Sequence, residues 1–489
     1  MHKNRRENML FQDEALMQAL RKHFHKTDTE DVTEAELIAM TSFSARKADI
    51  HNLKGLEIAV NLTYLDLTGN YLNSLEALES MTQLTTLNVS KNQIRELWPI
   101  SQHRDLKRLD LSNNNLYMLD LAAISRLDNL EELNLDRTKI NSIEALEGMK
   151  KLRVLRLGIA GLAPSIYPLS TLPSLEVLTM NHMWMYEIHD LTYLKNLKHL
   201  ELSTNLFRDL SPLHSMTKLE YLDISNNKYL SNVDVLEDLV NLKELDLSFN
   251  PIHNFGFLKN LHQLTRLRVT QTGLRDASIL GELHHLHKLD ISDNRLHHLD
   301  KLKNLNQLIY FKASNCQLRH IDFLKEATSL EEISVYNNMI HSIEVLKQCS
   351  KLTTLDISNN LIQDIHCLKE QYNLECLLMA NNSIKDLTPI EHLTNLGVLD
   401  VYNNVVDSLK PLEKLINLTR LRLDHNGIMD LSPLSKLIYL SGLSLKANYV
   451  TDVSPLKKLS GLYELRLDDN PIEDISVLED LEYYDKFSS

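Results

Sequence analysis

The stretch that decides the fold is residues 418–428, Leu-Thr-Arg-Leu-Arg-Leu-Asp-His-Asn-Gly-Ile. Its apolar residues and its asparagine follow the pattern L-x-x-L-x-L-x-x-N-x-I. The same pattern lies 22 residues earlier, from Leu396 to Val406, and 22 residues later, from Leu440 to Val450. Followed in both directions, it gives nineteen copies between Leu62 and Ile472. A fixed period of this length indicates a series of stacked units.

The spacing inside the stretch is explained by the direction of each side chain. Alternate side chains of a strand share a face, so Leu421 and Leu423 point to one side while Arg420 and Arg422 point to the other. Units stacked with parallel strands about 4.8 Å apart bury their leucines in one continuous core. The backbone must turn after each strand. The repeated asparagine both donates and accepts, so it can bond the backbone groups that these turns leave inside.

The other half of each unit indicates short turns. Between residues 429 and 439, Leu431, Leu434 and Leu437 recur at every third position, which fits 3₁₀ turns better than an α-helix. Period and motif together resemble the leucine-rich repeat. The resemblance implies an α/β repeat fold, a right-handed solenoid shaped as a horseshoe or arc. Its parallel strands would line the concave face and its 3₁₀ turns the convex face.

The N-terminal region predicts a helical cap on the first coil. Leu16, Leu20 and Phe24 stand at helical spacing, and Thr33 with Glu36 forms a capping box for a second short helix. Because terminal repeats of solenoids need such a cover, deletion of the cap is expected to cause aggregation or partial unfolding. We expect a cap over residues 1–39, a solenoid of one degenerate and nineteen regular repeats over 40–475, and a tail over 476–489.

Several segments resemble bacterial internalins more closely than leucine-rich repeat proteins in general. The resemblance implies a bacterial protein that acts by binding another protein. No export signal, immunoglobulin-like flank, wall-sorting motif or basic anchoring module is found in the sequence, so localisation and partner do not transfer. The period also resembles eukaryotic phosphatase-1 regulatory leucine-rich proteins, although the cap favours the bacterial family. The segments are Phe11-x-Asp13, Asp31-Val32-Thr33-x-x-Glu36-Leu37, Leu53-Lys54-Gly55-Leu56-Glu57 and Asp430-Leu431-Ser432-Pro433-Leu434.

Composition favours a soluble protein whose partner is another protein. The net charge of −14 opposes binding to nucleic acid or to an anionic membrane, because those surfaces require clustered Lys and Arg. The sequence has neither a signal-peptide pattern nor a run of about eighteen apolar residues. We therefore expect a cytoplasmic monomer, or a secreted or surface protein if the sequence is a piece of a longer one. The four cysteines lie inside the repeats, which favours a reducing compartment.

Catalytic motifs are missing from the sequence, so we expect neither an enzyme nor a cofactor. There is no phosphate-binding P-loop, no G-x-S-x-G, no H-E-x-x-H and no C-x-x-C. Cys316 stands where the repeat has asparagine, a substitution that the motif allows. His298 and His320 are equivalent positions one coil apart, but no carboxylate or thiolate completes a ligand set, so no metal site is expected.

Three other functions compete with a binding scaffold. One is an effector enzyme such as a leucine-rich-repeat ubiquitin ligase, for whose catalytic domain the repeats leave no room. Another is a binding fragment or effector subunit of a larger secreted protein. The third is an adaptor similar to the phosphatase regulators.

The solvent-facing strand positions form the candidate binding surface. The central column of these positions, to which Asp356 and Asp400 belong, contains more acidic than basic residues. This composition favours a partner with a basic surface. In the C-terminal half, apolar and aromatic residues gather there, and such residues anchor protein interfaces. The predicted protein-binding residues are Tyr310, Tyr336, Asp356, Cys376, Leu378, Val398, Asp400 and Tyr402.

A second patch is predicted between residues 130 and 186. Three successive repeats there lack the asparagine and have Thr138, Ala160 and Met183 instead. Loss of the amide weakens the bonding between coils, which predicts a distorted segment that acts as a hinge or a second docking site. Its exposed residues would be Trp184 and Tyr186.

Overall fold

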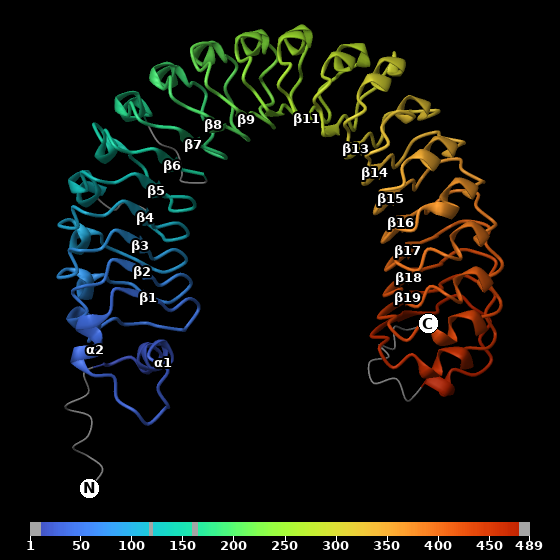
Figure 1. The fold of residues 1–489 in the computed structure, drawn as a ribbon, viewed down its shortest axis with the longest axis horizontal. Helices are drawn as coiled ribbons and strands as arrows, with labels where there is room; N and C mark the ends of the chain where they lie inside the picture. The colour runs from blue at the N-terminus through green and yellow to red at the C-terminus, as the bar shows by residue number, and fades with distance from the viewer. Residues whose placement is uncertain (1–10, 117–120, 159–164, 479–489) are drawn as a thin grey trace. The chain divides into compact units, whose positions relative to one another are not determined.

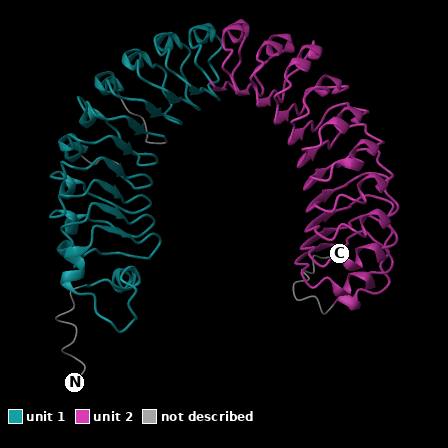
Figure 2. Cartoon of the chain, viewed as in Figure 1, with its two compact units in different colours: residues 1–242 teal, residues 243–489 magenta. Residues whose placement is uncertain are grey.

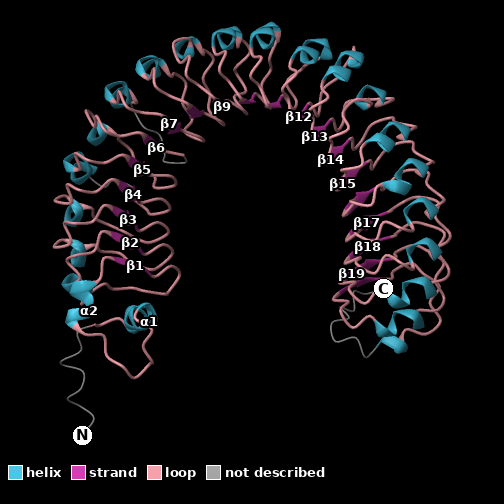
Figure 3. Ribbon diagram, in the orientation of Figure 1, coloured by secondary structure: helices cyan, strands magenta, loops and turns pink. Residues whose placement is uncertain are grey.

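The protein forms two compact units, residues 1–242 and residues 243–489, which we call unit 1 and unit 2 (Figure 2). The computed structural model describes residues 11–116, 121–158 and 165–478 (Figure 1). Within each unit one motif recurs, a short strand on one side of the coil and a short helix on the opposite side (Figure 3).

Two α-helices precede the repeats. They are α1 (Glu14–His23) and α2 (Glu34–Ala39). The predicted capping box of α2 is confirmed, because Thr33 and Glu36 bond each other's backbone N–H groups. Asp13 caps α1 by accepting from Leu16 N at 3.0 Å. Its second oxygen accepts from the backbone of residues 51 and 52 at 2.6 and 2.9 Å, which ties α1 to the first repeat.

The strands are three residues long, and within each unit they pair in parallel with their neighbours in sequence order. Each residue pairs with the one a repeat later, as in Tyr64 with Thr86 or Cys376 with Val398, so the predicted stacking is confirmed. The strands of unit 1 are β1 (Ser42–Ser44), β2 (Tyr64–Asp66), β3 (Thr86–Asn88), β4 (Arg108–Asp110), β5 (Glu132–Asn134), β6 (Val154–Arg156), β7 (Val177–Thr179), β8 (His199–Glu201) and β9 (Tyr221–Asp223). Those of unit 2 are β10 (Glu244–Asp246), β11 (Arg266–Arg268), β12 (Lys288–Asp290), β13 (Tyr310–Lys312), β14 (Glu332–Ser334), β15 (Thr354–Asp356), β16 (Cys376–Leu378), β17 (Val398–Asp400), β18 (Arg420–Arg422), β19 (Gly442–Ser444) and β20 (Glu464–Arg466).

The opposite side of each coil carries 3₁₀ helices, as the spacing of three predicts. In unit 1 they are η1 (Leu56–Ile58), η2 (Glu76–Leu78), η3 (Trp98–Ile100), η4 (Leu121–Arg126), η5 (Glu144–Leu146), η6 (Tyr167–Thr171), η7 (His189–Tyr193), η8 (Ser211–Leu213) and η9 (Asp234–Asp238). In unit 2 they are η10 (Gly256–Asn260), η11 (Ala277–Glu282), η12 (Leu299–Asn304), η13 (Asp322–Leu324), η14 (Glu344–Gln348), η15 (His366–Glu370), η16 (Thr388–Ile390), η17 (Lys410–Leu412), η18 (Ser432–Lys436), η19 (Ser454–Lys458) and η20 (Ser476–Leu478).

The core lies between the strands and the 3₁₀ helices of each coil. In the repeat that begins at Leu418, the side chains of Leu418, Leu423, Ile428 and Leu434 are 0% exposed and that of Leu421 is 2% exposed. Burial of one such group contributes about 2 kcal/mol. The strand is shorter than predicted, since Leu418 and Leu423 lie just outside β18. Their burial comes from the stacking of coils rather than from strand geometry.

The repeated asparagine forms the predicted ladder between coils. Asn426 donates from Nδ2 to Val401 O at 2.9 Å and to Leu423 O at 3.0 Å, and its Oδ1 accepts from Val406 N at 3.0 Å. One side chain thus bonds buried backbone groups of two successive repeats. Val401 O and Leu423 O also accept from the neighbouring ladder residues Asn404 and Asn448, at 3.2 and 2.9 Å.

Repeats without the asparagine satisfy fewer of these groups. Thr138 donates to the carbonyl of Leu135, and Cys316 donates from Sγ to Ile291 O at 3.2 Å. Ala160 lies outside the described residues. The distorted segment expected here therefore stays a prediction.

Candidate functional site

Five of the predicted binding residues meet on three adjacent strands, β15, β16 and β17. Asp356 pairs with Leu378, and Leu378 pairs with Asp400, so an apolar side chain stands between two carboxylates. Cys376 and Val398 form the neighbouring pair. All five side chains are half-buried, so they remain accessible to a ligand while their backbones belong to the sheet.

A sixth predicted residue, Tyr402, extends this cluster beyond the end of β17. The guanidinium of Arg422 lies 4.3 Å from the Tyr402 ring centroid, and His425 meets the ring edge-on at 5.3 Å. Arg422 Nε is 2.9 Å from Asp424 and Nη1 is 3.6 Å from Asp400. A cation held between two carboxylates and an aromatic face is fixed in position.

The solvent-facing side of these strands carries a hollow of about 390 Å³. It contains Leu378, Val398 and Asp400 of the predicted set. Its other polar members, which lie on β18, β19 and β20, were not predicted from the sequence. The sequence does hold a sign of this hollow. The first position of each strand of unit 2 carries a side chain except at Gly442, where the missing side chain leaves space. These members are Arg420, Arg422, Gly442, Ser444, Glu464 and Arg466.

Tyr310 and Tyr336 do not join this hollow. Tyr310, on β13, lies in a separate hollow of about 190 Å³ on β11 to β14. Burial and the neighbouring Asp290 raise the pKa of Tyr310. Tyr336 follows β14 and is 42% exposed. The predicted set is thus divided over three places on the face.

Burial also governs the acidity of the main cluster. It raises the pKa of Asp400, against the opposing effects of the Tyr402 N–H and Arg422. Burial, with the charges of Asp356 and Asp400, raises the pKa of the Cys376 thiol. Asp400 is therefore easier to protonate than an ordinary aspartate, and Cys376 is a poor nucleophile at neutral pH.

The second predicted patch is exposed. The side chains of Trp184 and Tyr186 are 59% and 69% exposed. Tyr186 borders a hollow of about 340 Å³ together with Arg208 and Asp209, whereas Trp184 does not. This patch offers fewer converging charges than the cluster on unit 2.

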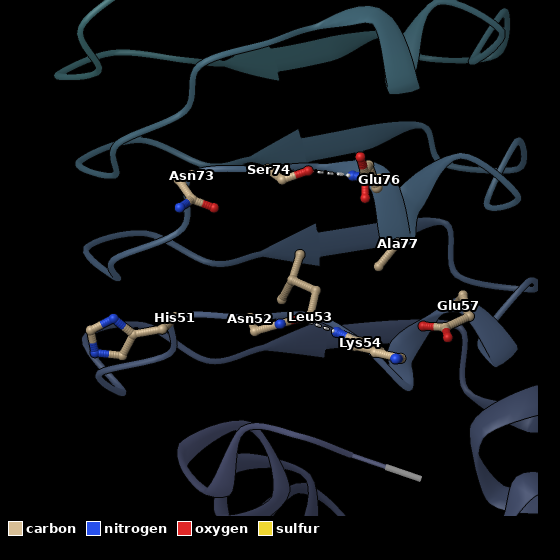
Figure 4. Close-up of a pocket in the computed structure, with 9 residues that line it drawn as sticks. All are labelled: His51, Asn52, Leu53, Lys54, Glu57, Asn73, Ser74, Glu76 and Ala77. Carbon is tan, nitrogen blue, oxygen red and sulfur yellow. Dashed lines mark hydrogen bonds between the residues drawn. The ribbon is translucent and has the colours of Figure 1, made fainter.

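A groove of about 470 Å³ lies beside the first two repeats. Figure 4 shows that its side chains come from residues 51–57 and 73–77. Asn52 Oδ1 accepts from Lys54 N at 2.7 Å, and Ser74 Oγ accepts from Glu76 N at 3.2 Å. These groups stabilise local turns, so the groove is a weaker candidate than the hollow on unit 2.

The cysteines and histidines offer little reactive chemistry. Burial raises the pKa of Cys316 to about 12, of Cys349 to about 11 and of Cys367 to about 12. Among the described residues, no three His, Cys, Asp or Glu side chains come together as metal ligands. His320 contacts Asp322 at 3.5 Å on the surface. No helix within the described residues is long and apolar enough to span a membrane.

Comparison with curated proteins gives one partial relative. Adenylate cyclase of Schizosaccharomyces pombe is 32% identical over 155 residues, which cover 30% of this chain and 9% of that protein. The chain therefore spans less than a tenth of the length of this relative, and its cyclase activity does not transfer.

Solved structures of similar fold come from bacteria and plants. The functional domain of InlJ from Listeria monocytogenes is 24% identical, with a TM-score of 0.50 and coverage of 86% of this chain and 80% of that domain. A leucine-rich repeat protein of Leptospira interrogans is 23% identical, with a TM-score of 0.59 and coverage of 84% and 97%. The ectodomain of the receptor kinase GASSHO1/SCHENGEN3 from Arabidopsis thaliana, in complex with CASPARIAN STRIP INTEGRITY FACTOR 2, is 20% identical, with a TM-score of 0.51 and coverage of 85% and 62%. At these identities the likeness, including that to an internalin, is one of fold.

Family comparison agrees with the repeat architecture. The description "Leucine rich repeat" matches residues 104–158 and 239–256. The description "Leucine Rich repeats (2 copies)" matches residues 60–102, 195–238, 328–370 and 372–414. These matches together cover about half of the chain. The chain belongs to the leucine-rich repeat family.

Proposed function

We propose that this protein is a non-enzymatic scaffold that binds a protein ligand on the sheet face of unit 2. One observation carries the proposal: Leu378 stands half-exposed between Asp356 and Asp400 in strand register, at the border of the 390 Å³ hollow. An apolar anchor surrounded by polar groups is typical of protein interfaces.

Two further observations support this function. The three buried thiols with raised pKa values are poor nucleophiles, which argues against a cysteine-based effector enzyme. The ectodomain of the fold neighbour GASSHO1/SCHENGEN3 was solved in complex with CASPARIAN STRIP INTEGRITY FACTOR 2, so a solenoid of this kind can serve as a binding surface.

Site-specific photo-crosslinking tests the proposal. A benzophenone amino acid is placed at Val398, in the hollow, or at Tyr372, which is 55% exposed just after η15. Each protein is then irradiated in an extract of the source organism. We expect a discrete crosslinked protein from position 398, lost when Leu378→Arg is added, and none of the same mass from position 372. An identical pattern from both positions, or no product at 398, would contradict the proposal.

A further inference from the structure

Two of the described strands carry arginine at both solvent-facing positions. They are β11, with Arg266 and Arg268, and β18, with Arg420 and Arg422. Each lies in one of the two hollows on the sheet face of unit 2. The net charge of the protein is −14. Positive side chains nevertheless gather in these two hollows.

The arginines differ in the partners that hold them. Arg266 contacts Glu244 at 2.8 Å, Arg268 contacts Asp246 at 3.5 Å, and Arg422 contacts Asp424 at 2.9 Å. Arg420 forms no ion pair within the described residues. It lies beside the hydroxyl group of Tyr463, whose pKa Ser441 and Arg420 lower. Its guanidinium therefore keeps its capacity to bind a carboxylate.

Gly442 opens space directly beside the Arg420 side chain. In strand register it lies between Arg420 and Glu464. A Cβ atom at Gly442 would lie 3.7 Å from Arg420 Cγ and 3.7 Å from Glu464 Oε2, which is ordinary van der Waals contact. Glu464 is itself paired with Arg466 at 3.2 Å. The notch at Gly442 thus lies between the Arg420 guanidinium, which forms no ion pair within the described residues, and a Glu464 carboxylate that is paired with Arg466.

We propose that the hollow over Gly442 binds a carboxylate of the protein partner, either from an Asp or Glu residue or from the partner's C-terminus, through the guanidinium of Arg420. This inference rests on the function proposed above and adds the chemistry of the partner. Arginine presents paired N–H groups that match a carboxylate, while Leu378 and Val398 supply apolar contact in the same hollow.

The proposed carboxylate ligand differs from the basic partner that the acidic column favours, which stays a prediction. Two aspartates of that column, Asp246 and Asp400, are already paired with Arg268 and Arg422. Their charge is compensated within the sheet face. Arg420, which lies outside the central column, forms no ion pair within the described residues and is available to a charged ligand.

Short synthetic random peptides test this chemistry on the intact protein. They are made in two sets that end in a free carboxylate or in a carboxamide, and binding is measured by fluorescence anisotropy. We expect the affinity of the peptides that bind to depend on one carboxylate group. Its conversion to an amide should weaken binding about tenfold or more, as expected for a hydrogen bond to a charged group. The two sets distinguish a C-terminal carboxylate from one on an Asp or Glu residue.

Variants of the protein locate the effect. Arg420→Gln should cause the same loss and abolish the difference between acid and amide, and Gly442→Val should block the notch. Arg266→Gln, a matched change in the other Arg-Leu-Arg strand, should leave binding unchanged. Circular dichroism verifies that each variant folds.

The outcomes separate the two proposals. Peptides that bind Arg420→Gln as tightly as the wild type but are lost with Leu378→Arg would overturn the carboxylate site and leave the proposed function standing. Peptides insensitive to Leu378→Arg, or a screen that retains no peptide, would count against both.

Discussion

Substitution of Asn426 by alanine tests how much of the stability comes from the asparagine ladder. The side chain is 8% exposed. It donates to the carbonyl oxygens of Val401 and Leu423 and accepts from the N–H of Val406, at 2.9, 3.0 and 3.0 Å. Alanine replaces none of these bonds.

The expected cost follows from Val406 N–H, which loses its partner, and from the bonds lost at Val401 O and Leu423 O, which keep bonds from Asn404 and Asn448. An unsatisfied buried polar group costs about 1–3 kcal/mol. With one such group and two lost hydrogen bonds of about 0.5–1 kcal/mol each, Asn426→Ala should destabilise its repeat by about 2–4 kcal/mol. Asn417→Ala is the matched control, because Asn417 is exposed and donates one bond, to Thr394 O at 2.8 Å. It should cost about 0.5–1 kcal/mol.

Amide hydrogen exchange is the suitable assay, since long repeat arrays need not unfold in one step. Mass spectrometry of peptides spanning residues 401–428 reports the free energy of local opening. Urea unfolding followed by circular dichroism gives the effect on the whole protein. If Asn426→Ala differs from Asn417→Ala by less than about 1 kcal/mol, the ladder does not carry the stability that its hydrogen bonds suggest.

Three further predictions use other features of the repeats. Cys316→Asn should restore the missing ladder amide and raise stability by about 1 kcal/mol, and a lower urea midpoint would show that the site cannot hold it. Burial lowers the pKa of His103, so the unfolded protein binds a proton near pH 6.5 while the folded protein does not. Stability should therefore fall as pH drops below about 6.5; His103→Leu should weaken that dependence in urea titrations, and the exposed His284→Gln should not. Asp13→Ala removes the cap of α1 and its bond to His51 N, so exchange in residues 14–23 should speed up by an amount equal to about 2 kcal/mol, and unchanged exchange would show that α1 is held by packing alone.

The fold was predictable because its decisive signals are local and repeat. The period places Tyr64 opposite Thr86 and Cys376 opposite Val398, and the strands pair in that register. The ladder was predictable from the chemistry of asparagine alone. The period also indicates that His103 is buried, because it places His103 at the position of Met81 one repeat earlier. Both side chains are 0% exposed.

The candidate site was predictable only in part, because the hollow depends on which charged groups pair. Register brings Asp400, Asp424 and Glu464 within reach of the arginines, but it does not say which carboxylate each arginine takes. In the structure Arg422 pairs with Asp400 and Asp424, whereas Arg420 lies beside the Tyr463 hydroxyl and forms no ion pair within the described residues. These choices depend on side-chain rotamers, which a repeat pattern does not encode.

The ladder and the hollow are connected through Asp424. Its carbonyl oxygen accepts from the ladder Asn426 at 3.1 Å. Its buried carboxylate accepts from the Ser444 hydroxyl and from Lys446 N at 2.8 Å, and pairs with Arg422. The bonds that join successive coils therefore also fix the guanidinium of Arg422, which lines the same hollow as Arg420. A binding site held by the backbone stack rather than by a long loop is organised before its ligand arrives, which lowers the entropic cost of binding.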